Sequence, residues 1–201
     1  WIGYSDFCNR VKNGWLFRDI TYQQVWAGYK TDDTNENGTT WEKSTIRMWL
    51  NAIFYNKAFN SAEQAIILTT SVDNNKEQCY SSWSKNDGNN TQDKIFLLSY
   101  AEVKKYFDVV YWKNAGPKEN KKPRIAPTAY AIAQGASTFS LYKTVDGADS
   151  GWWWLRSLGQ NGIEVAAVGA SGCLHSFSAY ETSASIRPAM WVNIDSLIKQ
   201  V

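Results

Sequence analysis

Cysteine and histidine, the residues that build most metal and redox sites, are scarce in this chain. Its 201 residues include three cysteines and a single histidine, His175. They form no CxxC pair or other metal-ligand spacing, and one histidine cannot complete a classical zinc site. No glycine-rich phosphate loop follows an expected strand. We therefore expect no metal and no organic cofactor, although carboxylates and loop carbonyls would still suit structural calcium. Cys8 and Cys79 leave a disulfide and two reduced thiols open as alternatives, and we favour reduced thiols.

The chain also lacks a marked charge excess and a long apolar run. Its formal net charge is +2, which argues neither for nor against an acidic partner. Residues 113–122 are basic, but Glu119 interrupts their four lysines, a pattern more typical of a solvated loop than of a nucleic-acid surface. No apolar run is long enough to span a bilayer. We expect no nucleic-acid partner and no membrane insertion within this sequence.

Aromatic residues, in contrast, are abundant. Eleven tryptophans and eleven tyrosines suit a loop-rich fold whose core is filled by rings rather than by long regular elements. The length fits one large domain, and no internal repeat or clean linker divides it. We therefore predict a single domain over residues 1–201.

Apolar spacing and capping residues locate the helices. Residues 44–57 carry apolar side chains at helical spacing behind Ser44, a preferred N-cap. This helix should pack against the C-terminal strand through Trp49. Ser61 and Gln64 have capping-box spacing, which predicts a second helix start. Other expected elements are a helix from Ser99, boxed with Glu102, to Phe107, a helix over 127–134, and buried strands over 66–68 and 95–98.

Residues 151–191 are the stretch around which the rest of the chain is organised. Aromatic and β-branched residues predict strands over 152–155 and 186–194, the second one central in its sheet and antiparallel to its neighbours. Arg156 and Arg187 each stand beside large apolar residues. That setting favours buried, paired arginines over catalytic ones.

The interior of this stretch differs from its ends. Residues 164–168 and 172–174 are typical of short strands, and the turn residues between them predict a hairpin. Residues 175–180 show no clear period. Their tyrosine, serine and histidine are typical of adaptable recognition surfaces such as antibody loops.

Several motif blocks resemble a known family. They read WEKSTIRMWLN over 41–51, DKIFLLS over 93–99, WWLRS over 153–157 and IRPAMW over 186–191, with Gly159, Ala166, Val168 and Gly172 at matching places. They are similar to a large bacterial domain family of formally unknown function, whose C-terminal motif is roughly WWLRSPG, a variable run, then VRPALW. The resemblance covers residues 15–195. It departs from the family pattern at Leu158, where proline is usual, and at Ser178, where glycine is frequent, and both departures bear on loop geometry.

Members of that family resemble C-type-lectin-fold domains, and many are similar to the target proteins of diversity-generating retroelements. In those proteins a reverse transcriptase randomises chosen codons, and the fold displays the varied residues as a ligand-binding face. The resemblance implies an α+β, C-type-lectin-like (formylglycine-generating-enzyme-like) fold with short antiparallel strands, flanking helices and many loops. It also implies a receptor- or adhesin-type module with a protein or glycan ligand, displayed at a cell surface, outside the cell or on a phage particle.

The composition of residues 165–180 agrees with such variation. In those retroelements only adenines are varied, usually in AAC codons, so Glu, Gln, Lys, Met and Trp cannot arise. Residues 165–180 contain none of these five types. Gln160, Glu164 and Glu181 therefore mark the limits of any varied set.

Two other functional classes rank below a varied binding module. The first is a fixed structural or adhesin domain of a bacterial or phage surface protein. The second is an enzyme, for which Cys173 and His175 are the best candidates because they lie on the same side of an expected strand. Neighbours on one strand rarely form a nucleophile–base contact, and no orienting acid is near. Formylglycine-generating enzymes share the lectin-like fold but depend on paired cysteines, and Cys173 has no such neighbour. The Glu-Pro-Asn, Gln-Pro-Asp and Trp-Asn-Asp motifs of calcium-dependent lectins are absent. We predict a protein that is not an enzyme.

These inferences divide the variable and ligand-binding region, residues 151–191, into scaffold and surface, because strand neighbours point to opposite sides. We expect a largely buried scaffold, with both arginine heads hydrogen-bonded, made of Trp153, Leu155, Arg156, Val168, Leu174, Ile186 and Arg187. We expect one exposed ligand-binding face made of Ala167, Gly169, Ala170, Ser171, Cys173, His175, Ser176, Phe177, Ala179 and Tyr180. Phe177 and Tyr180 would anchor a ligand, since rigid aromatic residues carry much of the binding energy at protein interfaces.

Overall fold

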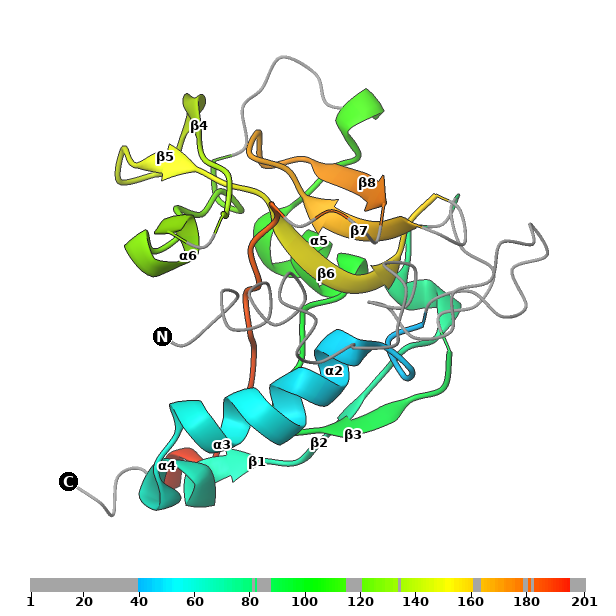
Figure 1. The fold of residues 1–201 in the computed structure, drawn as a ribbon. Helices are drawn as coiled ribbons and strands as arrows, with labels where there is room; N and C mark the ends of the chain where they lie inside the picture. The colour runs from blue at the N-terminus through cyan, green and yellow to red at the C-terminus, as the bar shows by residue number, and fades with distance from the viewer. Residues whose placement is uncertain are drawn as a thin grey trace, which may run out of the picture.

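The computed structural model describes residues 40–195 except 81, 83–87, 115–120, 134, 161–163, 179–180 and 182 (Figure 1). The features expected in residues 1–39, including Cys8, lie outside the described residues, as do Ala179 and Tyr180. Within the described part, short helices and short antiparallel strands are joined by irregular segments. The predicted α+β, loop-rich class is therefore confirmed.

The first described helix agrees closely with the sequence prediction. It runs without a break through α2 (Thr45–Trp49), η2 (Leu50–Phe54) and α3 (Tyr55–Ala58), η2 being a π-helical segment. Ser44 is its N-cap, and the Ser44 hydroxyl accepts from the Arg47 amide at 3.3 Å. The buried apolar face comprises Ile46, Trp49, Leu50, Phe54 and Tyr55.

The next helix, α4 (Ser61–Ile66), begins at Ser61 as predicted, but its capping residue is the one before. Asn60 is the N-cap, with its side chain accepting from the Glu63 amide at 3.0 Å. The Glu63 carboxylate returns a bond to the Asn60 amide at 2.8 Å. The predicted box of Ser61 with Gln64 is therefore wrong, because the stronger carboxylate acceptor stands three residues after Asn60.

The later helices follow the prediction. Helix α5 (Tyr100–Phe107) starts with the expected capping box, in which the Ser99 hydroxyl and the Glu102 carboxylate each accept an amide of the other residue. Helix α6 (Ala129–Ala133) lies inside the range predicted for it. Two short 3-10 turns are η3 (Lys76–Gln78) and η4 (Trp112–Asn114).

The described strands form four small antiparallel sheets. The three two-stranded sheets pair β1 (Ile67–Leu68) with β9 (Trp191–Val192), β2 (Thr70–Val72) with β3 (Thr91–Asp93), and β4 (Phe139–Lys143) with β5 (Asp149–Ser150). The fourth sheet has the order β6 (Trp153–Leu158), β7 (Glu164–Val168), β8 (Leu174–Ser178). In Figure 1, α6 and the β4–β5 hairpin project together to one side of this sheet.

The C-terminal strand is not central, so that prediction was wrong. Only two residues of the predicted range 186–194 form a strand, and β9 pairs with β1 alone. Pro188 lacks an amide donor for strand pairing. The segment before β9 therefore pairs with other segments through isolated bridges, such as Phe96 with Ala189. Ala189 packs against the large apolar cluster that includes Trp49, and the predicted direct contact of this segment with the Trp49 side chain stays a prediction.

Two other predicted strands are shorter than expected. Residues 95–97 are buried, yet in place of a strand they form the single bridge at Phe96. Of residues 66–68, only Ile67–Leu68 form a strand, and the Leu68 side chain is exposed. Burial was therefore predicted better than strand pairing.

Apolar side chains cover both faces of the three-stranded sheet. On one face, Trp154 and Ala167 belong to the cluster that contains Trp49. On the other face, Val168 packs with Val103 of α5. The central strand β7 is consequently buried on both sides, and only β8 and the turns beside it reach the surface. No helix in the described part of the chain has the length and apolar character that a bilayer crossing requires.

Candidate functional site

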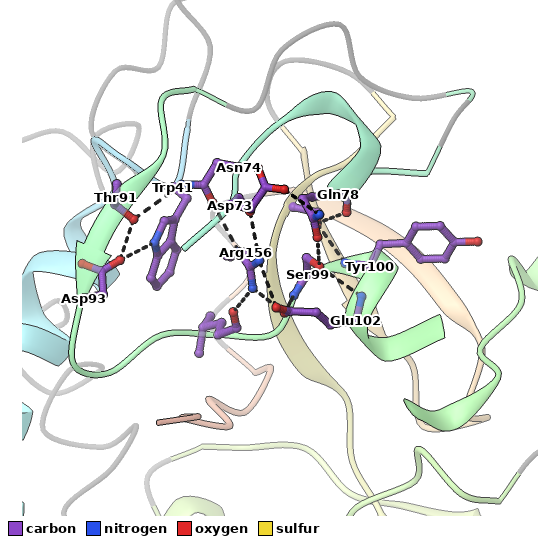
Figure 2. A network of polar contacts seen from close by, with 12 residues as sticks. Trp41, Asp73, Asn74, Gln78, Thr91, Asp93, Ser99, Tyr100, Glu102 and Arg156 are labelled. Atoms are coloured by element: carbon purple, nitrogen blue, oxygen red, sulfur yellow. Dashed lines mark hydrogen bonds and ion pairs between the residues drawn. The ribbon is translucent and has the colours of Figure 1, made fainter. Parts of the chain in front are cut away.

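Arg156 of β6 is the centre of a buried polar network (Figure 2). Its guanidinium donates to the carbonyl oxygens of Leu97 at 2.7 Å and Asp73 at 3.0 Å. Its Nε donates to the side-chain oxygen of Asn74 at 3.2 Å. Its Nη1 lies 2.5 Å from a carboxylate oxygen of Glu102, and the two side chains are 2% and 29% exposed. The predicted burial and hydrogen bonding of Arg156 are confirmed.

A second part of the network ties the earlier motif blocks together. The Trp41 indole donates to the Asp93 carboxylate at 2.9 Å, and the Thr91 hydroxyl donates to the same oxygen at 2.7 Å. Arg47 Nε donates to the other Asp93 oxygen at 2.7 Å. Asn51 accepts from the backbone amide of residue 94 and donates to the carbonyl of residue 95. The motif residues therefore bind one another and the backbone, and they hold separate parts of the chain together.

Arg187 departs from the prediction that both arginine heads are hydrogen-bonded. Its side chain is only half-buried, and its guanidinium carbon lies 5.0 Å from the Trp153 ring centre and 5.4 Å from that of Phe107. Its Nη1 is buried without a hydrogen-bond partner in the described part of the chain. Burial lowers the pKa of Arg187 below its ordinary value. Aromatic faces here take the place of the expected hydrogen-bond acceptors.

The predicted hairpin of residues 164–174 is confirmed. Strands β7 and β8 pair in regular register, with Ala167 opposite His175 and Val165 opposite Phe177. The turn is closed by the Gly169 amide, which donates to the Cys173 carbonyl at 2.8 Å. Strand β8 continues through residues 175–178, where the sequence showed no strand period. The strand places alternate side chains of this segment on the same face of the sheet.

Three of the residues predicted to be exposed are buried instead. Ala167 is fully buried because β7 has an apolar cluster on each side. Gly169 packs under the His175 ring, and a β-carbon added there would lie 2.6 Å from His175 Cδ2. Ala170 is also buried, and its carbonyl accepts from the Ser150 hydroxyl at 2.7 Å. The prediction of exposure was wrong for these positions, because neither side of the β7 end faces solvent.

The remaining described residues of the predicted face are half-exposed. They are Ser171, Cys173, His175, Ser176 and Phe177. Leu174 is buried, so the predicted alternation around it is confirmed. The Ser176 hydroxyl donates to the Glu164 carboxylate and accepts from the Gln160 amide at 2.9 Å, which fixes the start of β7 to β8.

Five aromatic rings form a continuous row beside β8, and we call Trp112, His175, Phe177, Trp152 and Phe139 the aromatic row. Ring centres are 5.8 Å apart between Trp112 and His175, and 5.5 Å apart between His175 and Phe177, with nearly parallel planes in both pairs. The Phe177 centre lies 4.1 Å from Trp152, which in turn contacts Phe139 at 6.1 Å, both edge to face. The end members Trp112 and Phe139 are 47% and 39% exposed. The row therefore presents apolar ring surface to solvent at both ends.

The only polar groups in the aromatic row are the His175 imidazole and the indole nitrogens of its tryptophans, and the row carries no charge at neutral pH. Burial lowers the pKa of His175 below its ordinary value, so the imidazole is neutral at pH 7. The indole Nε1 of Trp152 is buried and has no hydrogen-bond partner in the described structure. Sequence reasoning missed Trp112, Trp152 and Phe139 as members of this surface. The three adjacent tryptophans were its only sequence signal, and they indicated a strand.

The cysteines, the histidine and the carboxylates are the side chains to examine for catalysis or metal binding. Cys173 and His175 flank the buried Leu174, and no hydrogen bond joins them in the described structure. Among the described residues, no group of three or more His, Cys, Asp or Glu side chains is placed to hold a metal ion. Cys79 is buried, with its sulfur 3.8 Å from the Leu158 carbonyl oxygen.

Comparison with known proteins gives one result. A family model described as Domain of unknown function (DUF6273) matches residues 14–194. No curated protein and no solved structure matches the chain. The matched range contains every motif block of the polar network and the whole aromatic row.

Proposed function

We propose that this chain, which belongs to the DUF6273 family, is a ligand-binding module of receptor or adhesin type with a C-type-lectin-like fold. Its recognition face is the aromatic row together with Ser171 and Cys173 of the preceding turn. The observation that carries the proposal is the row itself. Five rings in unbroken contact, with both ends open to solvent, form a rigid surface whose middle members Trp152 and Phe177 are anchored on the core.

The energetics of aromatic surfaces favour recognition over a passive role. Aromatic side chains bury a large area at low entropic cost, and ring pairs add edge and face preferences. Phe177 is held by contacts with Trp152 and Trp154, so its ring needs little ordering when a ligand binds. Half-exposed Ser171 and Cys173 add small polar groups on the preceding turn, whereas Ser176 alternates with His175 and Phe177 and points to the other face of the sheet.

We further propose that the module is the target of a diversity-generating retroelement. The half-exposed positions of β8 lie inside the window 165–180, which lacks the five residue types that adenine variation cannot produce. Trp112, Trp152 and Phe139 lie outside that window, so in this proposal they are the constant part of the face. A protein or glycan at a cell surface, outside the cell or on a phage particle is the ligand class that fits.

Two experiments test the proposal. The gene's neighbourhood should hold a reverse transcriptase and a near-copy of the segment encoding residues 151–191 that differs at adenines. If the locus contains neither, the retroelement proposal fails and a fixed adhesin module becomes the better interpretation.

Binding is tested by presenting labelled protein to protein and glycan arrays and to bacterial cells. The double variant Trp112→Ala/His175→Ala should lose saturable binding, whereas Leu141→Ala, at a side chain 79% exposed and outside the row, should retain it. Equal binding by both variants would show that the aromatic row is not the recognition face.

A further inference from the structure

We propose that the chain has a second binding site, a cavity between β2, α5 and β9 that takes a neutral saccharide. The cavity has a volume of about 300 Å³, at the lower end of the range of small-ligand sites. None of its lining residues belongs to the aromatic row, so it is a separate site. It does not depend on the proposed function of the β8 face.

Two large aromatic side chains at this cavity remain open to solvent. Trp191 of β9 is 54% exposed and Tyr106 of α5 is 50% exposed, and both line the cavity. Trp191 belongs to a motif that the sequence placed in a central strand, yet its indole has no place in the core. A pyranose ring presents a face of C–H bonds, which buries well against such a ring because the aromatic face is apolar and electron-rich.

The opposite wall is polar and already fixed. Glu102 lines the cavity, and its carboxylate is held by Arg156 at 2.5 Å and by the Ser99 amide at 2.8 Å. Asp73 also lines it, with its oxygens accepting from the Asn75 amide and the Gln78 side chain. The two bonds to Glu102 occupy Oε2, whereas Glu102 Oε1 and the two Asp73 oxygens each accept a single bond, so both carboxylates can still accept from ligand hydroxyls. Their positions are set before a ligand arrives, which lowers the entropic cost of binding.

The charges at the cavity select against ionic ligands. The two carboxylates, of Asp73 and Glu102, are matched by Arg156 behind Glu102 and by Lys105 on the lining, which gives a net charge of zero. A phosphorylated or amino sugar would have to give up the solvation of its own charge in a cavity whose net charge offers no overall attraction in return. Hydroxyls between aromatic and carboxylate walls meet no such penalty. A neutral sugar is therefore the chemical class that fits.

Saturation-transfer NMR with methyl glycosides tests the site on the whole chain. The probes are the methyl glycosides of glucose, galactose, mannose and N-acetylglucosamine, with glucose 6-phosphate and glucosamine as charged counterparts. We expect ring protons of at least one neutral glycoside to receive saturation, with a Kd of about 1 mM, and the charged sugars to receive less. Trp191→Ala should raise the Kd about tenfold, and Trp191→Phe should recover part of the affinity because a ring remains.

The matched control is Trp112→Ala, which removes an indole of similar exposure, 47%, from the aromatic row. It should leave the Kd unchanged. Both tryptophans are about half exposed, so both variants should keep the urea-unfolding midpoint of the parent chain. The proposal is overturned if no neutral glycoside binds, if the charged sugars bind better, or if Trp191→Ala leaves the affinity intact. Loss of sugar binding in Trp112→Ala alone would place the saccharide on the aromatic row and would also overturn it.

Discussion

Removing the Arg156 side chain should lower the free energy of unfolding by more than a substitution of an exposed residue does. Breaking a buried ion pair costs about 3–5 kcal/mol, because the remaining charge stays desolvated. Glu102 is 29% exposed, so water can solvate part of its carboxylate and the lower end of that range applies. The carbonyls of Leu97 and Asp73 and the Asn74 side chain also lose a donor, which moves the expected cost from the lower end to the middle of that range. We therefore expect Arg156→Ala to lower the free energy of unfolding by about 4 kcal/mol.

Urea unfolding followed by tryptophan fluorescence measures the effect. With a denaturant slope of about 2 kcal/mol per molar, the midpoint should fall by about 2 M. Arg156→Lys keeps the charge but loses the planar fork, and its midpoint should lie about halfway between. Lys143→Ala is the control, because the Lys143–Asp149 pair is 48% and 41% exposed and worth about 0.5 kcal/mol. If Arg156→Ala and Lys143→Ala shift the midpoint equally, the network in Figure 2 does not hold the scaffold as argued.

Three further outcomes follow from local geometry. Gly169→Ala should displace the His175 ring from Trp112, because the new β-carbon meets His175 Cδ2 at 2.6 Å, and the His175 ring signals in NMR should shift. The lowered pKa of His175 means that the unfolded chain takes up a proton first as pH falls below about 6.5. The free energy of unfolding should therefore decrease between pH 7 and pH 5.5, and His175→Phe should flatten that slope in urea titrations. Asn60→Ala should lower the unfolding free energy by about 1 kcal/mol. Ser61→Ala should leave the unfolding free energy nearly unchanged. A larger loss in Ser61→Ala than in Asn60→Ala would show that Ser61 is the N-cap, as the sequence predicted.

The cap at α4 shows how local sequence rules reach a limit. Both Asn60 with Glu63 and Ser61 with Gln64 have capping-box spacing, so the pattern alone allowed two starts. The structure uses the pair that contains the carboxylate. At α5 the sequence offered Ser99 with Glu102 alone, and that prediction is confirmed. Local rules therefore locate a helix well and its first residue only when one cap is available.

The errors at the predicted face have a different physical origin. Residues 165–168 read VAAV, a run apolar at every position, which is typical of a strand buried on both faces. We interpreted it as alternating, and Ala167 was placed on the surface. The aromatic row could not be predicted, because Trp112, Phe139 and Trp152 come from separate parts of the chain and meet β8 only in the folded molecule.

The burial of β7 decides where a diversified segment could vary without unfolding the chain. Ala167 has no exposed surface, and Gly169 has no room for a β-carbon under His175. A larger side chain at either position would overpack the sheet, at a cost of about 1–3 kcal/mol. Ser171, Cys173 and Ser176 are half-exposed, so a range of side chains fits at these positions. Random substitution across residues 165–176 would then produce many unfolded proteins, whereas substitution confined to the half-exposed positions would keep the scaffold intact. In the near-copy of the gene segment, adenine differences should therefore fall on the codons of those three residues and spare the codons of Ala167 and Gly169.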